Sequence, residues 1–139
     1  SNWRGPVWIP INYLIIQSVK KFGDFYEDHL TVEYPTGTGN YMTLHEVAHE
    51  LTKRVISLFE LDTQNNRRLH GDENWFYSLP ENKDLVLFYE YFHGDDGGGL
   101  GASHQSGWTA LVAELINEMS EKMPPAEKRS KQFFEDDDD

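Results

Sequence analysis

The sequence predicts an all-α fold in which long loops join the helices. Three segments carry apolar residues at helical spacing, and they cover residues 9–22, 43–60 and 109–123. The segments between them are long, and they are rich in polar residues, glycine or proline, which is typical of functional loops. At 139 residues the chain is long enough for one ordinary domain.

The first predicted helix, residues 9–22, is apolar on nearly every side in its first half and amphipathic after that. Such a pattern indicates a helix largely buried in a core, because a helix at the surface carries polar residues on its outer side. We therefore expect this helix to pack against neighbours that this chain does not contain. A loop with Pro35, Gly37 and Gly39 follows at residues 33–42.

The second and third predicted helices each have one apolar face. The second begins at Thr43 and ends near Glu60, and the third covers residues 109–123, where Pro124 and Pro125 stop it. The apolar positions of the second helix share one side: Leu44, Val47, Ala48, Leu51, Val55 and Leu58.

The remaining segments are predicted to be irregular or short. Residues 62–83 are polar and indicate a surface loop with short elements, whereas the apolar residues 85–89 indicate a strand or an extended approach to Glu90. Residues 124–139 end in the run EDDDD and are predicted to be a charged, disordered tail. The folded portion is thus expected to cover residues 1–123.

Composition excludes several classes of protein. The net charge of −12 argues against nucleic acid and anionic membranes as partners, because their phosphates would be repelled. The absence of cysteine excludes disulfides, thiol catalysis and cysteine zinc sites. No stretch approaches the roughly 20 apolar residues of a membrane span, and the opening SNWRGP shows no signal peptide. We therefore predict a cytoplasmic location and no membrane partner.

Residues 88–112 combine the features that a sugar-binding pocket needs. Glu90 stands among aromatic residues, four glycines follow within residues 97–101, and the polar residues at 103–105 precede Trp108. Glycines cost backbone entropy unless a turn or a ligand requires them, so we expect this loop to bring backbone close to a sugar or to close over it.

The opening WRGPVW, residues 3–8, supplies a second part of the predicted site. A glycosidase needs two carboxyl groups across the scissile bond, and Glu90 is a candidate for one of them. In the alternative, the tryptophans pack in the core and Glu90 binds loop amides. The candidate aromatic platforms are Trp3, Trp8 and Trp108, and the candidate polar contacts are Arg4, His104 and Gln105.

A competing pattern lies on the second predicted helix. His45, Glu46 and His49 form H-E-x-x-H, in which two imidazoles on one helix face hold Zn²⁺ and the glutamate acts as general base. Thr43 and Glu46 also form T-x-x-E before an apolar run, which is a capping box and explains Glu46 without a metal. The zinc metallopeptidase therefore stays as an alternative.

Several separated blocks of the sequence resemble glycoside hydrolase family 63. They are WRGPVW, NYL at residues 12–14, the segment around Glu90 that leads into the glycine-rich loop, and GWTALV at residues 107–112. The resemblance covers residues 2–117 and is strongest to the branch with mannosylglycerate and glucosylglycerate hydrolases. It is more distant to the processing α-glucosidase of N-glycan precursors. It implies the C-terminal portion of an (α/α)6 barrel, an inverting mechanism and no cofactor.

The resemblance also implies roles for individual residues. Glu90 matches the general base that activates water, and Gln105 matches a glutamine that contacts the substrate. The aspartate that serves as general acid in the family has no counterpart here, so this chain alone is expected to be inactive. The residues matched in the first block are Trp3 and Trp8, which line the sugar subsite, and Arg4 and Asn12, which shape it.

The sequence therefore predicts part of an inverting hydrolase of α-glucosides or α-mannosides. The expected partners are an oligosaccharide or small glycoside and the remainder of the barrel. Besides the metallopeptidase, the alternative is a degenerate fragment that binds carbohydrate without catalysis.

Overall fold

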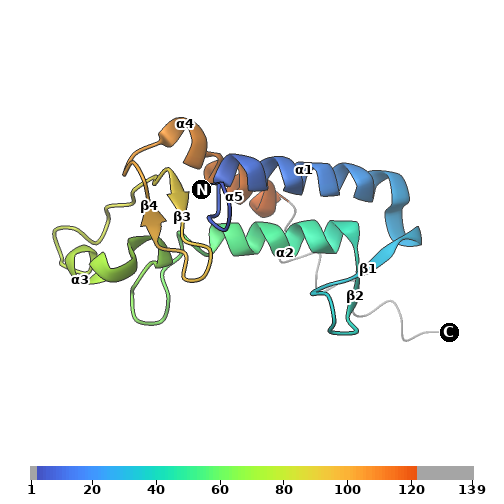
Figure 1. The fold of residues 1–139 in the computed structure, drawn as a ribbon, viewed down its shortest axis with the longest axis horizontal. Helices are drawn as coiled ribbons and strands as arrows, with labels where there is room; N and C mark the ends of the chain where they lie inside the picture. The colour runs from blue at the N-terminus through green and yellow to red at the C-terminus, as the bar shows by residue number, and fades with distance from the viewer. Residues whose placement is uncertain (1–2, 122–139) are drawn as a thin grey trace, which may run out of the picture.

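Two long helices, α1 (Ile9–Tyr26) and α2 (Leu44–Ile56), lie side by side in opposite directions, and α5 (Leu111–Glu121) packs against both (Figure 1). The structure is a computed structural model, and it describes residues 3–121. The described part is mostly helical, which confirms the main feature of the predicted fold. The prediction of a disordered tail at residues 124–139 lies outside the described residues.

Helix α1 buries one side at a seven-residue spacing, through Ile9, Ile16 and Gly23. Pro10 occupies the first turn, where its missing N–H costs no hydrogen bond. The helix continues one turn past the predicted end at residue 22. Gly23 does not end it because this glycine serves packing: a Cβ there would stand 3.1 Å from the His45 ring. A short 3-10 helix, η1 (Glu27–His29), follows.

The connection from α1 to α2 is a β-hairpin, which corrects the all-α prediction. Strands β1 (Thr31–Glu33) and β2 (Tyr41–Thr43) pair antiparallel, with Thr31 opposite Thr43. The loop predicted at residues 33–42 forms the turn of this hairpin, but its first and last residues belong to the paired strands. Strands of three residues are too short to show an alternating pattern in the sequence.

Helix α2 begins with the predicted capping box. The Thr43 side chain accepts a hydrogen bond from the Glu46 N–H, and the Glu46 carboxylate accepts one from the Thr43 N–H. The helix ends at Ile56 instead of Glu60, and turns carry the chain onward from Ser57.

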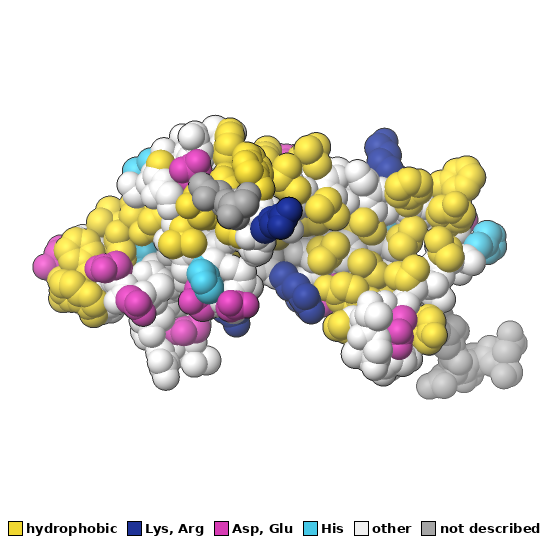
Figure 2. All heavy atoms as spheres, viewed as in Figure 1, with side chains coloured by type: hydrophobic (Ala, Val, Ile, Leu, Met, Phe, Trp, Pro, Cys, Tyr) yellow, Lys and Arg dark blue, Asp and Glu magenta, His cyan; other side chains and the backbone are white. Residues whose placement is uncertain are grey.

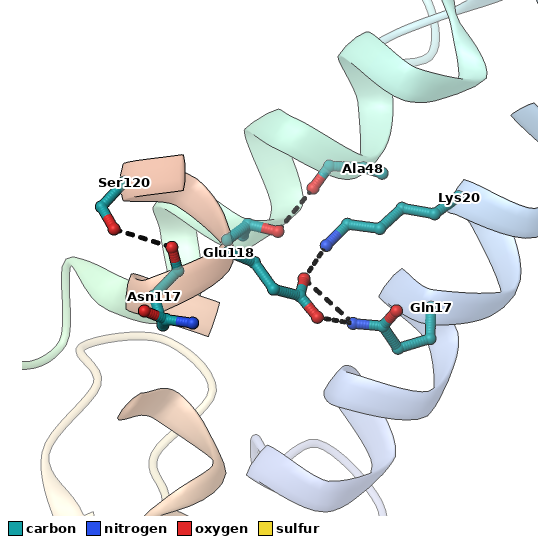
Figure 3. Close-up of polar contacts among 7 residues, drawn as sticks. Gln17, Lys20, Ala48, Asn117, Glu118 and Ser120 are labelled. Carbon is teal, nitrogen blue, oxygen red and sulfur yellow. Dashed lines mark hydrogen bonds and ion pairs between the residues drawn. The ribbon is translucent and has the colours of Figure 1, made fainter. Parts of the chain in front are cut away.

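The third predicted helix, residues 109–123, begins two residues later than expected, and a separate short helix precedes it. A four-residue helix, α4 (Ser106–Thr109), is followed by α5, which begins at Leu111. Glu118 of α5 then fastens this helix to α1, since its carboxylate accepts a hydrogen bond of 2.8 Å from the Gln17 amide and forms an ion pair with Lys20 (Figure 3). The Lys20 and Glu118 side chains are mostly buried, so solvent screens the pair less than a surface one.

The other end of the molecule is a lobe of short elements (Figure 1). It contains η2 (Arg68–Glu73), α3 (Asn74–Tyr77), and strands β3 (Tyr91–Phe92) and β4 (Gly99–Leu100), which pair antiparallel. The prediction of short elements at residues 62–83 is confirmed. Residues 85–89 belong to no helix or strand and lead in extended form to β3.

Within residues 3–121 no helix is long and apolar enough to cross a membrane.

One apolar core joins the helices to this lobe. The buried core residues come from α1, α2 and α5, from the turn after α2, and from η2 and β3 of the lobe: Ile9, Ile16, Ala48, Val55, Ile56, Leu58, Leu69, Phe92, Val112 and Leu115.

Replacing Thr43 by alanine removes one half of the capping box. We expect the Thr43→Ala substitution to lower the free energy of unfolding by about 1 kcal/mol, because the Glu46 N–H at the helix start loses its acceptor. Urea denaturation followed by circular dichroism measures this change. Thr63→Ala, at an exposed loop threonine, is the control and should stay within about 0.5 kcal/mol of the parent.

Candidate functional site

A short backbone pairing brings the two predicted parts of the site together. The Val7 N–H donates to the Phe92 carbonyl at 2.8 Å, and the Phe92 N–H donates to the Val7 carbonyl at 2.9 Å. Gly94 permits this close approach, since a Cβ there would stand 2.3 Å from the Gly5 carbonyl oxygen. The WRGPVW segment is thereby fixed beside the strand that follows Glu90.

Four aromatic side chains gather at this junction. Trp8 stacks on Trp3 with ring centroids 4.4 Å apart and on Tyr91 with centroids 4.6 Å apart, and the Trp108 ring lies 5.7 Å away. Trp8 itself is only 6% exposed and belongs to the core, whereas Trp3 is 65% and Trp108 37% exposed. The structure thus brings the three predicted tryptophans together, and Trp3 and Trp108 offer faces to solvent.

Tyr91 is a member of this cluster that the sequence analysis did not single out. Its position directly after Glu90, within the aromatic run at residues 88–92, is the signal that pointed to it. The ring stacks under Trp8 and so links the tryptophans to the segment that carries the carboxylate.

Glu90 is half-buried, and it directly precedes Tyr91, a member of the aromatic cluster. Its Oε2 accepts a hydrogen bond of 3.1 Å from the Ala102 N–H. Within residues 3–121 only this one of its two oxygens accepts a hydrogen bond, so Oε1 is left for other contacts. The predicted alternative, in which Glu90 binds loop amides, is thus present for one amide N–H, that of Ala102.

The segment downstream of the glycines is tied to the backbone just before Glu90. The Gln105 N–H donates to the Phe88 carbonyl at 2.7 Å, and the Thr109 hydroxyl donates to the Tyr89 carbonyl. Gln105 stands at the N-terminal cap position of α4, and His104 beside it is exposed. Both predicted polar residues thus lie on the segment that holds the Glu90 backbone.

The other predicted polar residues lie at the start of α1. The Asn12 amide donates to the Trp8 carbonyl at 2.9 Å, so it fixes the backbone beneath the stacked rings. Arg4 is exposed in the turn that precedes Val7. Asn12 therefore has a structural partner, and Arg4 is open to solvent.

The glycine-rich loop is closely packed. A Cβ on Gly99 would stand 2.1 Å from the Tyr89 ring, and one on Gly97 would stand 2.7 Å from the Leu58 side chain. These glycines are required because neighbouring side chains occupy the space where a Cβ would lie. The loop therefore packs closely against Tyr89 and Leu58.

The H-E-x-x-H residues lie elsewhere, on α2; His49 is exposed, whereas Glu46 and His45 make other contacts. Glu46 Oε2 accepts hydrogen bonds from the Thr43 N–H at 2.7 Å and from its hydroxyl at 3.1 Å. His45 lies 3.2 Å from the Asp24 carboxylate of α1. Within residues 3–121 no three His, Cys, Asp or Glu side chains are arranged to hold a metal ion. The glutamate that a metallopeptidase needs as base is committed to the helix cap.

A buried histidine of the lobe, His70, was not predicted from the sequence, because it stands in a polar segment. It is 4% exposed and stacks on Tyr77 with ring centroids 3.8 Å apart. Burial, helped by the charge of Arg67, lowers the pKa of His70 from 6.5 to about 4. Burial and a hydrogen bond with Tyr77 likewise raise the pKa of Tyr89 to about 12. Both groups are therefore neutral at pH 7.

Three relatives match most of this chain. An uncharacterized protein of Saccharomyces cerevisiae, YMR196W, is 50% identical over 121 residues. The mannosyl-oligosaccharide glucosidase of the same yeast is 28% identical over 118 residues, and the probable mannosyl-oligosaccharide glucosidase of Schizosaccharomyces pombe is 26% identical over 118 residues. The matches cover 84–86% of this chain.

These relatives are far longer than the chain, which spans 11% of the length of each. The two glucosidases belong to glycoside hydrolase family 63, so the chain has distant similarity to glycosidases of that family. No family model and no solved structure matches the chain significantly.

The low pKa of His70 predicts a pH-dependent stability. Between pH 6.5 and about 4, the unfolded chain binds a proton at His70 that the folded chain does not bind. The free energy of unfolding is therefore highest above pH 6.5 and falls as the pH drops toward 4. A shift of this size corresponds to about 3 kcal/mol.

Between pH 7 and pH 4.5, we expect His70→Phe, which keeps a ring against Tyr77, to lose about 2.5 kcal/mol less of its free energy of unfolding than the parent loses. Urea denaturation at the two pH values measures the difference. The matched control is His29→Gln at an exposed histidine, which should keep the parent's dependence. An unchanged dependence in His70→Phe would contradict the assignment.

Proposed function

We propose that this chain is the part of an inverting α-glycosidase that supplies the general base, Glu90, and part of the sugar subsite. The substrate class is α-glucosides or α-mannosides. The observation that carries this proposal is a half-buried glutamate directly before Tyr91, whose ring stacks on Trp8, in a chain distantly similar to two glucosidases.

The chemistry needs a base on one face of the sugar and an acid on the other. Glu90 removes a proton from water as the water oxygen attacks the anomeric carbon, and an acid outside this chain protonates the leaving oxygen as its bond to carbon breaks. The two carboxyl groups of such a pair stand about 6.5–9.5 Å apart, which leaves room for the water. The unoccupied Oε1 of Glu90 is the oxygen available for that proton.

Trp3 and Trp108 support the sugar subsite. Aromatic faces offer flat apolar area to the C–H side of a sugar ring, and polar residues at the rim bind the hydroxyls. Arg4, His104 and Gln105 lie on the two segments that carry these tryptophans, and all three take the role of polar contacts in the proposal.

The remainder of the barrel is proposed to cover the outer side of α1. Besides its buried side, α1 carries a second apolar face, along which apolar side chains gather in Figure 2. The relatives extend far beyond the matched stretch, so other helices of a longer polypeptide are the proposed occupant of this face. Its exposed residues repeat at helical spacing: Ile11, Leu14, Ile15, Phe22, Phe25 and Tyr26.

A second candidate function is carbohydrate binding without catalysis. The hydrogen bond from the Ala102 N–H to Glu90 favours it, because a loop carboxylate of purely structural use has the same contact. The two functions differ in what the carboxylate does, and the two experiments below separate them.

Glu90→Gln in the full-length protein tests the catalytic proposal. We expect hydrolysis of an α-glucoside or α-mannoside to fall on the order of 10³-fold, because glutamine cannot take a proton from water. Circular dichroism and the melting temperature should match the parent. Glu81→Gln, at an exposed glutamate, is the control with unchanged activity. Full activity in Glu90→Gln would leave only the binding function.

Trp3→Ala tests the subsite. Loss of one stacking face should weaken sugar binding about tenfold, which corresponds to about 1.4 kcal/mol. Isothermal titration calorimetry with an oligosaccharide, in the catalytically inactive Glu90→Gln background, measures the affinity. Trp75→Ala is the matched control, since Trp75 is 66% exposed and lies on α3, outside the aromatic cluster. Equal affinities in the two variants would refute the subsite.

A further inference from the structure

The strand pairing that follows Glu90 contains one extra residue. In the regular part of the ladder Tyr91 lies opposite Leu100 and Phe92 opposite Gly99, so the next partner of Glu90 would be Gly101. The Glu90 N–H instead donates to the carbonyl of Ala102, at 2.8 Å. Gly101 is therefore the additional residue of a β-bulge, and its φ of 72° is the left-handed value that favours glycine in such bulges.

The bulge directs a backbone N–H toward the side chain of Glu90. Ala102 donates its N–H to Glu90 Oε2 at 3.1 Å while its carbonyl accepts from the Glu90 N–H. One residue of the loop thus holds both the backbone and the carboxylate of the same glutamate. β-Bulges beside reactive groups commonly redirect a side chain in this way.

Gly101 also provides the space that the carboxylate occupies. A Cβ at this position would stand 2.6 Å from Glu90 Oε2, 2.9 Å from Glu90 Cβ and 2.7 Å from the Tyr91 ring. All three distances are shorter than real Cβ contacts allow, so some atoms must move. The carboxylate is the free end of a flexible side chain, and it is the group that would be displaced most easily.

We propose that Gly101 is a positioning residue for Glu90: its left-handed conformation forms the bulge, and its missing side chain leaves the space in which the carboxylate is held. The inference rests on the proposed function, because it assigns a role in catalysis through Glu90. It adds that the position of the base depends on the one-residue bulge: because Gly101 is the extra residue, Glu90 pairs with Ala102.

The test is Gly101→Ala in the full-length protein, with hydrolysis of an α-glucoside or α-mannoside as the assay. A displacement of about 1 Å in a catalytic group costs on the order of 10²-fold in rate. We therefore expect kcat to fall about 10²-fold while KM changes less than about twofold, since the tryptophan faces are untouched. Gly107→Ala is the matched control with parental kcat, because a Cβ there meets nothing within 4 Å.

A second variant separates the effect on the base from a failure to fold. Asparagine tolerates a positive φ better than alanine but still carries a Cβ. Gly101→Asn should therefore retain the circular dichroism spectrum of the parent and still lose kcat. A parental kcat in either folded variant overturns the proposal, and so does a fall in kcat that is matched by Gly107→Ala. Glu90→Gln is measured alongside: its full activity refutes the proposed function, whereas its inactivity together with an active Gly101→Asn refutes only the role of Gly101.

Discussion

The candidate site depends on the backbone pairing between Val7 and Phe92. Two hydrogen bonds, each contributing about 1 kcal/mol, fix the N-terminal segment to β3, and everything near Glu90 is arranged around that contact. Trp8 follows Val7 directly and Tyr91 precedes Phe92 directly, so the pairing places the two rings in register for stacking. Because Phe92 is fully buried, the junction is also anchored in the core. The pairing therefore couples the position of the aromatic faces to that of the carboxylate.

The long helices provide the support for this junction. Ile9, the first residue of α1, is fully buried directly after Trp8, and the Asn12 amide binds the Trp8 carbonyl. On the other side, Leu58 and Leu69 join α2 and the lobe to the same core. Packing of α5 is reinforced by the partly buried contact of Glu118 with α1. A carboxylate on a loop thus obtains a fixed position from rigid elements, which is what its proposed catalytic role requires.

The sequence allowed the helices and the main site residues to be predicted, but it did not reveal their spatial relations. The periodic apolar residues of α1, α2 and α5 indicated helices, and T-x-x-E at Thr43 indicated the cap, because both signals are local. The bulge at Gly101 was hidden, since it arises from a shift of one residue between two short strands. The burial of His70 was hidden as well, because the polar residues around it indicate a surface segment. Because Trp3 and Trp8 stand in one motif, the sequence could not show that Trp3 is exposed while Trp8 is buried.

The aromatic cluster also has a spectroscopic consequence. The chain contains four tryptophans, and three of them, Trp3, Trp8 and Trp108, lie in one aromatic cluster with Tyr91, the residue after Glu90. The fourth, Trp75, lies on α3. Indole fluorescence of this chain therefore reports mainly on this aromatic cluster. With Trp75 replaced by phenylalanine, the indole emission would come from that cluster alone, and it would test the proposed sugar binding without a label.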